Sequence, residues 1–211
     1  MPKPRPVLIT FEGIEGSGKS TLISALSQML LSARTDVLVT REPGGSDFGD
    51  ALRKIFLDPA FRIDPIAEAF LINAGRAQHV AERIGPALKA GTVVLCDRFF
   101  DATVAYQGYG RGLDIEMLLR LSLAATNSIA PDLTFLLDIS PELSQARVLA
   151  RGVVDRLEGE DVAFHARVRA GYLELAERFE RFVVLDGAQP PQSIAREAYE
   201  TILRRRHTAP L

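Results

Sequence analysis

The stretch VLITFEGIEGSGKS (residues 7–20) joins an apolar run to a loop that contains three glycines, a lysine and two serines. Residues 13–20 match the pattern Gly-x-x-x-x-Gly-Lys-Ser/Thr in full. Glycines allow backbone N–H groups to converge on phosphate oxygens, and the N-terminus of the following helix points at the same charge. The pattern therefore predicts a strand, a phosphate-binding loop (P-loop), a helix and a bound nucleoside triphosphate, rather than an ordinary strand-to-helix turn.

Lys19 is expected to reach the β- and γ-phosphates of ATP, and the Ser20 hydroxyl to hold Mg²⁺. The eight residues expected to bind ATP are Gly13, Ile14, Glu15, Gly16, Ser17, Gly18, Lys19 and Ser20.

Short β-rich runs alternate with longer helical runs along the rest of the chain. The strands are expected at 7–12, 37–40, 92–97, 133–138 and 182–186. The helices are expected at 18–33, 47–57, 64–90, 114–126, 141–151, 161–180 and 191–206. The long run 64–90 opens on Asp64-Pro65, an N-cap followed by proline, and stops at Gly91, and Pro86 is expected to kink it near its end.

Strands that are apolar throughout, such as Val93 to Cys96, need cover on both faces, so this alternation predicts a parallel sheet between two layers of helices. The expected fold is α/β, three layers with a five-stranded parallel sheet and the P-loop at its edge, formed by one domain over residues 1–211. Ligands bind beyond the carboxyl ends of such strands. Gly13, Arg41, Asp97 and Asp138 follow or close strands and are expected to meet there.

The composition and charge of the chain exclude several further classes of protein. The 211 residues are 47% hydrophobic and 25% charged with a net charge of −2, which gives no general attraction to nucleic acid or to an anionic membrane. The single cysteine, Cys96, rules out an internal disulfide framework and fits a packed core thiol. The N-terminal residues resemble neither a signal peptide nor a membrane span, so a cytoplasmic protein is expected.

A P-loop serves a switch, a motor or a phosphoryl transferase. A GTPase switch needs an Asn-Lys-x-Asp guanine-binding motif, and lysine follows neither Asn73 nor Asn127. A motor usually needs a longer chain or a basic surface. A small-molecule kinase therefore remains.

Three further sequence segments indicate which family of kinases the chain resembles. They are TREPGG (40–45), LRKIFLD (52–58) and CDRFFDATVAYQGYGRG (96–112). Together with GIEGSGKS they closely resemble the thymidylate kinase (dTMP kinase) family of the bacterial type. The resemblance covers essentially the whole chain, through PDL (131–133) and RGVVDRLE (151–158). It implies a three-layer P-loop kinase fold with a short lid. It also implies the reaction of ATP and dTMP to ADP and dTDP for dTTP biosynthesis, with Mg²⁺, in a cytoplasmic homodimer.

The resemblance also implies roles for an acceptor site. Arg41, Arg53 and Arg98 would clamp the dTMP phosphate, since guanidinium groups match phosphate oxygens in pairs. Glu15 would accept a hydrogen bond from the sugar 3′-OH. Tyr106 would press against the sugar where a 2′-OH would sit, and a core position is its alternative.

Arg76 and Gln107 would face the thymine edge, with Thr103 close to the base. A solvated helix surface is the alternative for Arg76. Many relatives place phenylalanine, which stacks on thymine, where this chain has Ile72. We expect either weaker thymine binding or a substitute contact from Phe70.

The acceptor phosphate is largely dianionic at neutral pH, so phosphoryl transfer needs no general base. Surface roles are accordingly expected for His79, His165 and His207. Asp97 is the expected Mg²⁺ partner beside Ser20, with Asp138 as the second candidate.

The P-loop carries no arginine, so the resemblance assigns that charge to a mobile lid near residues 150–160. Lys19 and Arg98 together with Arg151 and Arg156 of this lid are the expected catalytic residues, and Arg147 is a further candidate on the preceding helix. A kinase for another nucleotide and a non-catalytic nucleotide-binding module are the alternatives.

Overall fold

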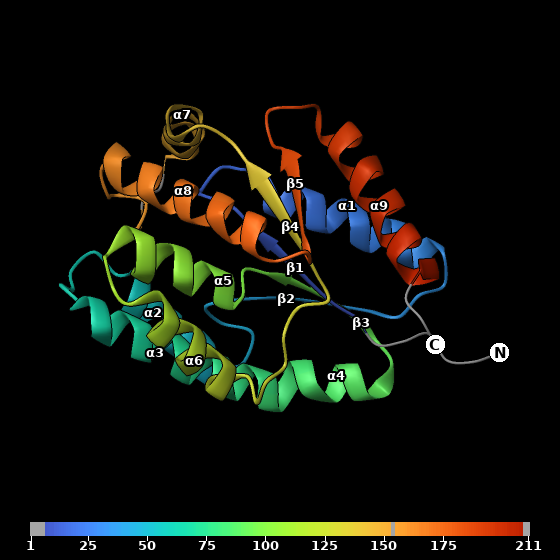
Figure 1. Ribbon diagram of the computed structural model, residues 1–211, viewed down its shortest axis with the longest axis horizontal. Helices are drawn as coiled ribbons and strands as arrows, with labels where there is room; N and C mark the ends of the chain where they lie inside the picture. Colours follow the sequence, from blue (N-terminus) through green and yellow to red (C-terminus); the bar gives the residue numbers. More distant parts are fainter. Residues whose placement is uncertain (1–6, 153–154, 209–211) are drawn as a thin grey trace.

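The computed structural model describes residues 7–152 and 155–208, and its centre is a five-stranded parallel sheet in the order β2-β3-β1-β4-β5 (Figure 1). The strands are β1 Val7–Glu12, β2 Val37–Arg41, β3 Val93–Asp97, β4 Leu133–Asp138 and β5 Phe182–Asp186. All five strands agree with the sequence prediction to within one residue. The predicted three-layer α/β fold is confirmed.

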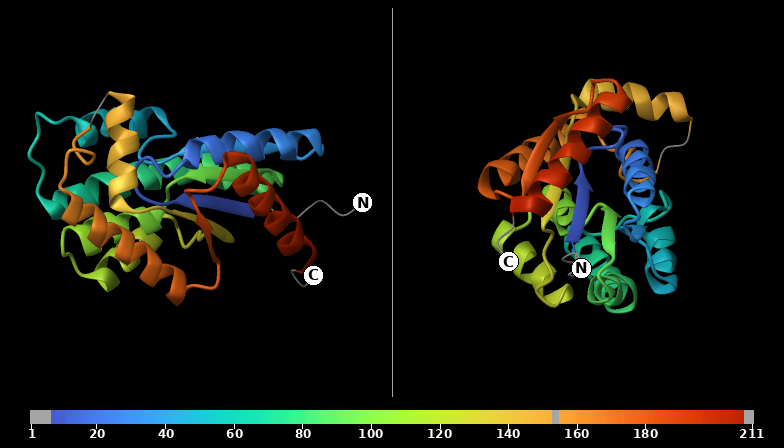
Figure 2. Two further views of the ribbon diagram at one scale, coloured as in Figure 1. Left: turned by 90° about the horizontal axis from the view of Figure 1, so that it is seen from above. Right: turned by 90° about the vertical axis from the view of Figure 1, so that its right-hand side faces the viewer.

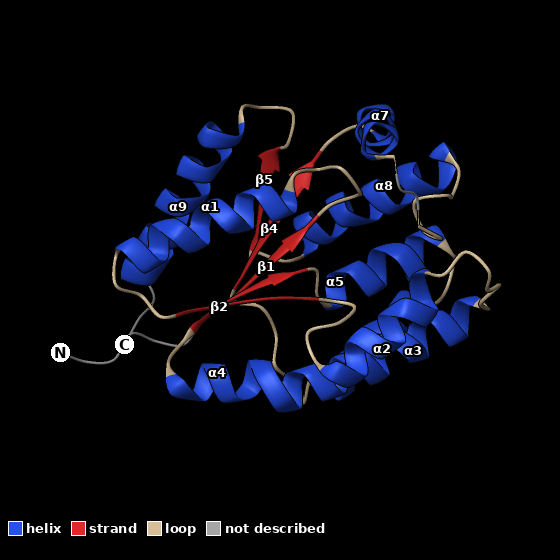
Figure 3. Cartoon of the chain, turned by 180° about the vertical axis from the view of Figure 1, so that it is seen from behind, coloured by secondary structure: helices blue, strands red, loops and turns tan. Residues whose placement is uncertain are grey.

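Alternate side chains of β1 enter two different cores, which explains why this strand is apolar on both faces. Ile9 and Phe11 pack with α1 (Lys19–Ser32) and α9 (Pro191–Thr208). Leu8 points the other way, into a cluster that contains Val80 and Ile84. A strand covered on both sides is buried throughout, as its sequence predicted. Figure 2 shows the sheet enclosed between helices, and Figure 3 shows the same layers from behind.

The N-terminal half of the chain places three helices beside β2 and β3. They are α2 Asp47–Leu57, α3 Pro65–His79 and α4 Gly85–Ala90. Asp64 caps α3 by accepting from the Ile66 N–H, as expected from the Asp-Pro pair.

The expected helix 64–90 is one helical run with a π-helical segment, η1 (Val80–Ile84), in place of a simple proline kink. Pro86 has no N–H to donate, and the wider turn just before it puts the Gly85 N–H on the Val80 carbonyl. Gly91 ends the run with φ +85°, as predicted.

The second half of the chain carries the helices α6 Ile115–Ala125, α7 Pro141–Arg151 and α8 Val162–Arg178. It also contains a helical segment that the sequence did not predict, α5 (Phe100–Thr103) continuing into the π-helical η2 (Val104–Gly110). This segment follows β3 directly and packs against α8. It brings residues 103, 106 and 107 to the edge of the sheet where ligands bind.

Candidate active site

The P-loop joins β1 to α1 in the conformation that its glycines require. Gly13, Gly16 and Gly18 have φ values of +132°, +69° and +100°. A Cβ on Gly13 would lie 2.5 Å from the Leu137 carbonyl oxygen. Only glycine fits this backbone without strain. No described side chain caps the start of α1, so its first N–H groups are available to an anion.

Lys19 folds back over the P-loop. Its ammonium donates to the carbonyl oxygens of Gly13 (3.0 Å) and Ile14 (3.1 Å) and to the Ser17 hydroxyl (3.3 Å). Burial, followed by the positive charge of Arg98, lowers the pKa of Lys19 to about 8. Burial disfavours the charged form of this ammonium, and a polyphosphate placed in the loop would favour it, because opposite charges nearby stabilise the protonated amine.

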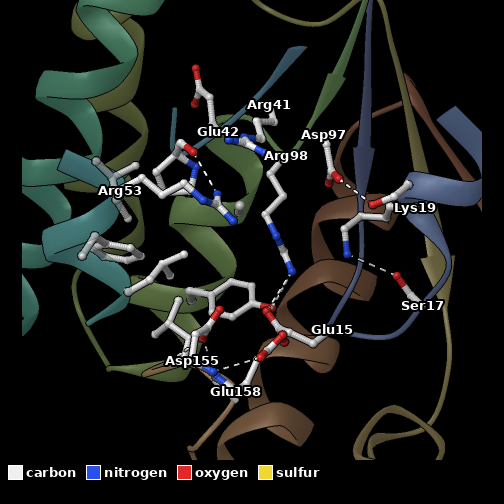
Figure 4. Close-up of a pocket in the computed structure, with 18 of the residues that line it drawn as sticks. Glu15, Ser17, Lys19, Arg41, Glu42, Arg53, Asp97, Arg98, Asp155 and Glu158 are labelled. Atoms are coloured by element: carbon white, nitrogen blue, oxygen red, sulfur yellow. Dashed lines mark hydrogen bonds and ion pairs between the residues drawn. The ribbon is translucent and has the colours of Figure 1, made fainter. Parts of the chain in front are cut away.

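A cavity of about 370 Å³ opens between the P-loop and the helical segments α2, α3 and η2 (Figure 4). The predicted site residues that line it are Glu15, Gly16, Ser17, Gly18, Lys19, Ser20, Arg41, Arg53, Ile72, Arg76, Asp97, Arg98, Thr103, Tyr106, Gln107 and Arg151. One cavity thus contains residues from strings that are far apart in the sequence.

Arg98 lies at the centre of a hydrogen-bond network in the cavity. Its guanidinium donates to Glu15 Oε1 (2.8 Å) and to the hydroxyls of Tyr106 (3.1 Å) and Tyr172 (3.0 Å). The Tyr106 hydroxyl also donates to Glu15 (2.6 Å), and that of Tyr172 donates to Glu12 (2.8 Å). Arg98 has φ +66°, an uncommon conformation for a non-glycine residue that tends to accompany function. These contacts aim one cation at the space between the P-loop and the opposite wall.

Two less restrained arginines lie on that opposite wall. Arg53 donates to the Pro43 carbonyl (2.9 Å), and Arg41 pairs with Asp50 at 3.6 Å. Burial, then the positive charge of Arg41, lowers the pKa of Arg53. In Figure 4, Arg41 and Arg53 lie on one side of the cavity and Lys19 on the other, with Arg98 between them. Mutually repelling cations around a cavity favour an anionic ligand.

Arg76 occupies the floor of the cavity and is only 2% exposed, so the solvated alternative is wrong. Its guanidinium donates to Glu42 (2.7 Å), Asn73 (2.9 Å), the Phe99 carbonyl (3.1 Å) and Thr103 (3.0 Å). Arg76 and Thr103 therefore brace each other within the fold. A contact from Arg76 to a base stays a prediction.

Ile72 lines the cavity, whereas the described cavity wall does not include Phe70, which is 57% exposed. Sequence reasoning missed Phe56 and Leu157, which supply apolar surface to the same wall. Phe56 could have been found, because it lies three residues after Arg53 on one helical face.

The described part of the expected lid is split between two places, and residues 153–154 lie outside the described residues. Arg151 lines the cavity and pairs with Glu158. Arg156 turns toward α2 and α3, where it donates to the Phe56 carbonyl (2.8 Å) and pairs with Glu68. The described cavity wall does not include Arg156. Its role in transfer stays a prediction.

Oxygen ligands suited to Mg²⁺ meet at the P-loop. The Ser20 hydroxyl donates to Asp97 at 3.3 Å, which places a hydroxyl and a carboxylate together beside the phosphate position. Both carboxylate oxygens of Asp138 instead accept from the guanidinium of Arg169, at 2.6 and 2.7 Å, so Asp138 does not fit the metal role. Among the described residues, no group of three or more His, Cys, Asp or Glu side chains is placed so that it could hold a metal ion.

The expectation of surface histidines is wrong for two of the three. His79 is 0% exposed and contacts Glu42 (3.0 Å) and Thr40 (2.7 Å), so it stabilises the loop REPGG (residues 41–45). His165 is buried beside Glu15, with 3.5 Å between Nδ1 and the nearer carboxylate oxygen. The side chain of His207 lies outside the described residues.

A lysine-bearing P-loop facing a second cationic site across one cavity defines a P-loop kinase, an enzyme that moves a phosphoryl group from a nucleoside triphosphate to a bound acceptor. The sequence profile of the thymidylate kinase family matches residues 11–198. The chain belongs to the thymidylate kinase family.

Several relatives and one solved structure agree with this assignment. Thymidylate kinases of Carboxydothermus hydrogenoformans and Desulfovibrio desulfuricans are 47% and 50% identical to this chain. The alignments cover 90% and 95% of the chain and 93% and 98% of the relatives. The crystal structure of thymidylate kinase from Ehrlichia chaffeensis superposes with a TM-score of 0.80 at 30% identity, over 94% of this chain and 100% of that one. No helix in the described part of the chain could span a membrane.

Proposed function

We propose how this enzyme of the thymidylate kinase family carries out its reaction, in which ATP and dTMP give ADP and dTDP. The P-loop binds the ATP phosphates, with Lys19 on the β- and γ-phosphates. Arg41, Arg53 and Arg98 bind the dTMP phosphate on the facing wall. The observation that carries this assignment is the single cavity that Lys19 shares with these three arginines.

Both reacting groups are anions, so the protein's main task is to bring them together against their repulsion. Arg98 lies between the two phosphate positions and contacts Glu15 of the P-loop, which suits it to neutralise charge that develops during transfer. The acceptor is a phosphate oxygen that is already largely ionised, so no side chain has to remove a proton from it. This accounts for a site that is rich in arginine.

Ser20 and Asp97 would hold Mg²⁺, Ser20 directly and Asp97 through water. Oxygen donors of this kind are those that Mg²⁺ prefers, and it usually takes one or two protein ligands together with substrate phosphates. When bound, the ion would neutralise charge on the ATP phosphates. Lys19 and the backbone N–H groups of the loop hold the same phosphates in place.

Arg151 is the lid arginine placed to reach the phosphates, because it already lines the cavity. Arg156 would join it only after leaving Glu68 and Phe56. Arg147 donates to the carbonyl oxygens of Gly16 (3.0 Å) and Gly187 (3.2 Å), which makes it a brace for the P-loop.

The acceptor's sugar and base would occupy the inner part of the cavity. Glu15 would accept from the 3′-OH, and Tyr106 would exclude a 2′-OH. Gln107, Thr103 and Arg76 would lie at the edge of thymine.

We further propose that residues 1–211 act as one catalytic domain and that the enzyme is a cytoplasmic homodimer which binds small nucleotides, not nucleic acid or membranes. Phe70 on α3 and Leu123 on the neighbouring α6 are exposed apolar groups that a second copy would cover.

Coupled ADP-release assays with dTMP, dUMP, dCMP, dGMP and AMP as acceptors test the proposal. We expect dTMP to give the highest kcat/KM. Faster turnover of another monophosphate would assign a different kinase activity, and ATP binding without acceptor-dependent ADP release would indicate a non-catalytic module.

A further inference from the structure

Glu68 on α3 is a fully buried carboxylate, and three described side chains donate to it. It is 0% exposed, and its Oε2 accepts from Gln107 Nε2 at 2.9 Å. Arg111 contacts both oxygens, with Nη2 3.2 Å from Oε1 and Nε 3.4 Å from Oε2, and Arg156 pairs with Oε1. The described wall of the cavity does not include Glu68. Any effect on the substrate must therefore pass through one of these partners.

Gln107 is the partner that reaches the cavity, and Glu68 determines how its amide is turned. A carboxylate has acceptor atoms only, so the NH₂ group of the amide has to face it. The amide oxygen of Gln107 is then the group left over. That oxygen, Oε1, is buried and has no hydrogen-bond partner among the described residues. An unsatisfied buried acceptor is costly, and a ligand that donates a hydrogen bond removes the cost.

The available oxygen selects the kind of base that fits. Thymine and uracil carry N–H at ring position 3 and donate there, whereas cytosine presents a bare nitrogen that accepts. With Glu68 in place, Gln107 offers its amide oxygen as an acceptor. Cytosine would bring a second acceptor, its ring nitrogen, to face that oxygen, and no hydrogen bond would form. We propose that Glu68 is a specificity-determining residue that acts by fixing the amide orientation of Gln107. This inference rests on the proposed placement of the base beside Gln107.

The two arginines make this orientation hard to reverse, and they also predict what a glutamine at position 68 would do. Oε1 of Glu68 accepts from both Arg111 Nη2 and Arg156 Nη1. In Glu68→Gln, the single amide oxygen would stay with these two cations. Its NH₂ group would then face Gln107, which would turn over to accept. The Gln107 NH₂ group would now be left for the base, which suits cytosine and not thymine.

The test measures kcat/KM for dTMP, dUMP and dCMP in wild type and in Glu68→Gln. The dTMP/dCMP ratio does not depend on the folded fraction, so loss of stability alone leaves it unchanged. We expect this ratio to fall at least tenfold, while the dTMP/dUMP ratio stays within twofold because both bases carry the same N–H. Arg111→Met is the matched control, since it removes one partner of Glu68 but leaves the contact with Gln107, and its dTMP/dCMP ratio should stay at the wild-type value.

An unchanged dTMP/dCMP ratio in an active Glu68→Gln variant would overturn the inference, as would an equal fall in Arg111→Met. Wild-type enzyme that does not phosphorylate dTMP would instead refute the proposed function. If Glu68→Gln does not fold, the wild type is tested with a dTMP analogue that has C–H in place of the ring N–H. We expect this analogue to bind at least tenfold more weakly than dTMP in a competition assay. Equal binding of the two would overturn the inference.

Discussion

Removing one oxygen atom, in Tyr106→Phe, separates the two roles of this side chain. The hydroxyl donates to Glu15 at 2.6 Å and accepts from Arg98 at 3.1 Å, so it joins the carboxylate expected at the sugar to the arginine expected at both phosphates. The ring packs edge-on against Phe164 and Tyr172, with centroids 6.1 and 6.3 Å apart. Phenylalanine keeps these ring contacts and loses only the two hydrogen bonds.

Arg98 and Glu15 also contact each other directly at 2.8 Å, so we take the net loss in kcat/KM for dTMP as that of one hydrogen bond to a charged group, about 1.5–3 kcal/mol. Since about 1.4 kcal/mol corresponds to a factor of ten, this is roughly a 10- to 150-fold fall. The same coupled assay should show an unchanged preference for dTMP over its ribonucleotide counterpart, because the ring that would exclude the 2′-OH remains.

Tyr172→Phe is the matched control. Its hydroxyl is also 3.0 Å from Arg98 but connects to Glu12, away from Glu15. We expect a smaller loss in kcat/KM than for Tyr106→Phe. Wild-type kcat/KM in Tyr106→Phe, or equal losses in the two variants, would refute the idea that the Tyr106 hydroxyl couples Glu15 to Arg98.

Four further outcomes are expected. Since the pKa of Lys19 is lowered to about 8, its ammonium loses its charge as the pH rises through that value, so kcat/KM for ATP should fall about tenfold per pH unit above it, and a flat profile to pH 10 would contradict this. Arg156→Ala should lower kcat about 100-fold with little change in dTMP KM, whereas matched effects on the two constants would assign Arg156 to ground-state binding. Asp97→Asn should raise the Mg²⁺ concentration needed for half-maximal rate about tenfold, and an unchanged concentration would show that this carboxylate has no part in holding the ion. Ile72→Phe should lower the KM for dTMP about two- to tenfold, and an unchanged KM would show that stacking at this position contributes nothing.

The fold and the P-loop were predictable because their signals are local. An apolar strand, glycines at fixed spacing and Lys19 on the first turn of a helix each act within a few residues of one another. The alternation of strands and helices then allows few arrangements other than a parallel sheet. The meeting of residues near 13, 41 and 97 at one edge follows from this topology alone.

The helical run from Phe100 to Gly110 was not predictable in the same way. Thr103, Val104 and two glycines, Gly108 and Gly110, lower its intrinsic helix propensity. Tertiary packing compensates, since a Cβ on Gly110 would meet the Phe164 ring at 2.7 Å. This close approach to α8 depends on a residue 54 positions away, which no local pattern reveals.

The burial of His79 was missed for a related reason. His79 lies on the same helix as Ile72 and Arg76, but the helical pattern alone does not say which residues pack against it. Its neighbour Glu42 lies in a different string, and only the folded chain brings the imidazole within 3.0 Å of that carboxylate. Buried polar side chains are hydrogen-bonded in folded proteins, but their partners are set by tertiary structure.

The arginines of the cavity differ in how firmly they are held, and this difference sorts their tasks. Arg76 donates to five groups among the described residues and is almost fully buried, so it shapes the floor of the cavity before any substrate arrives. Arg98 is held by Glu15 and two hydroxyls but remains at the cavity surface. Among the described residues, Arg53 makes a single hydrogen bond to a carbonyl, and Arg41 has only a loose pair with Asp50. Because a phosphate dianion replaces weak contacts at little cost, the arginines with the fewest internal bonds are those best able to take it up, while the firmly held ones keep the geometry that makes transfer possible.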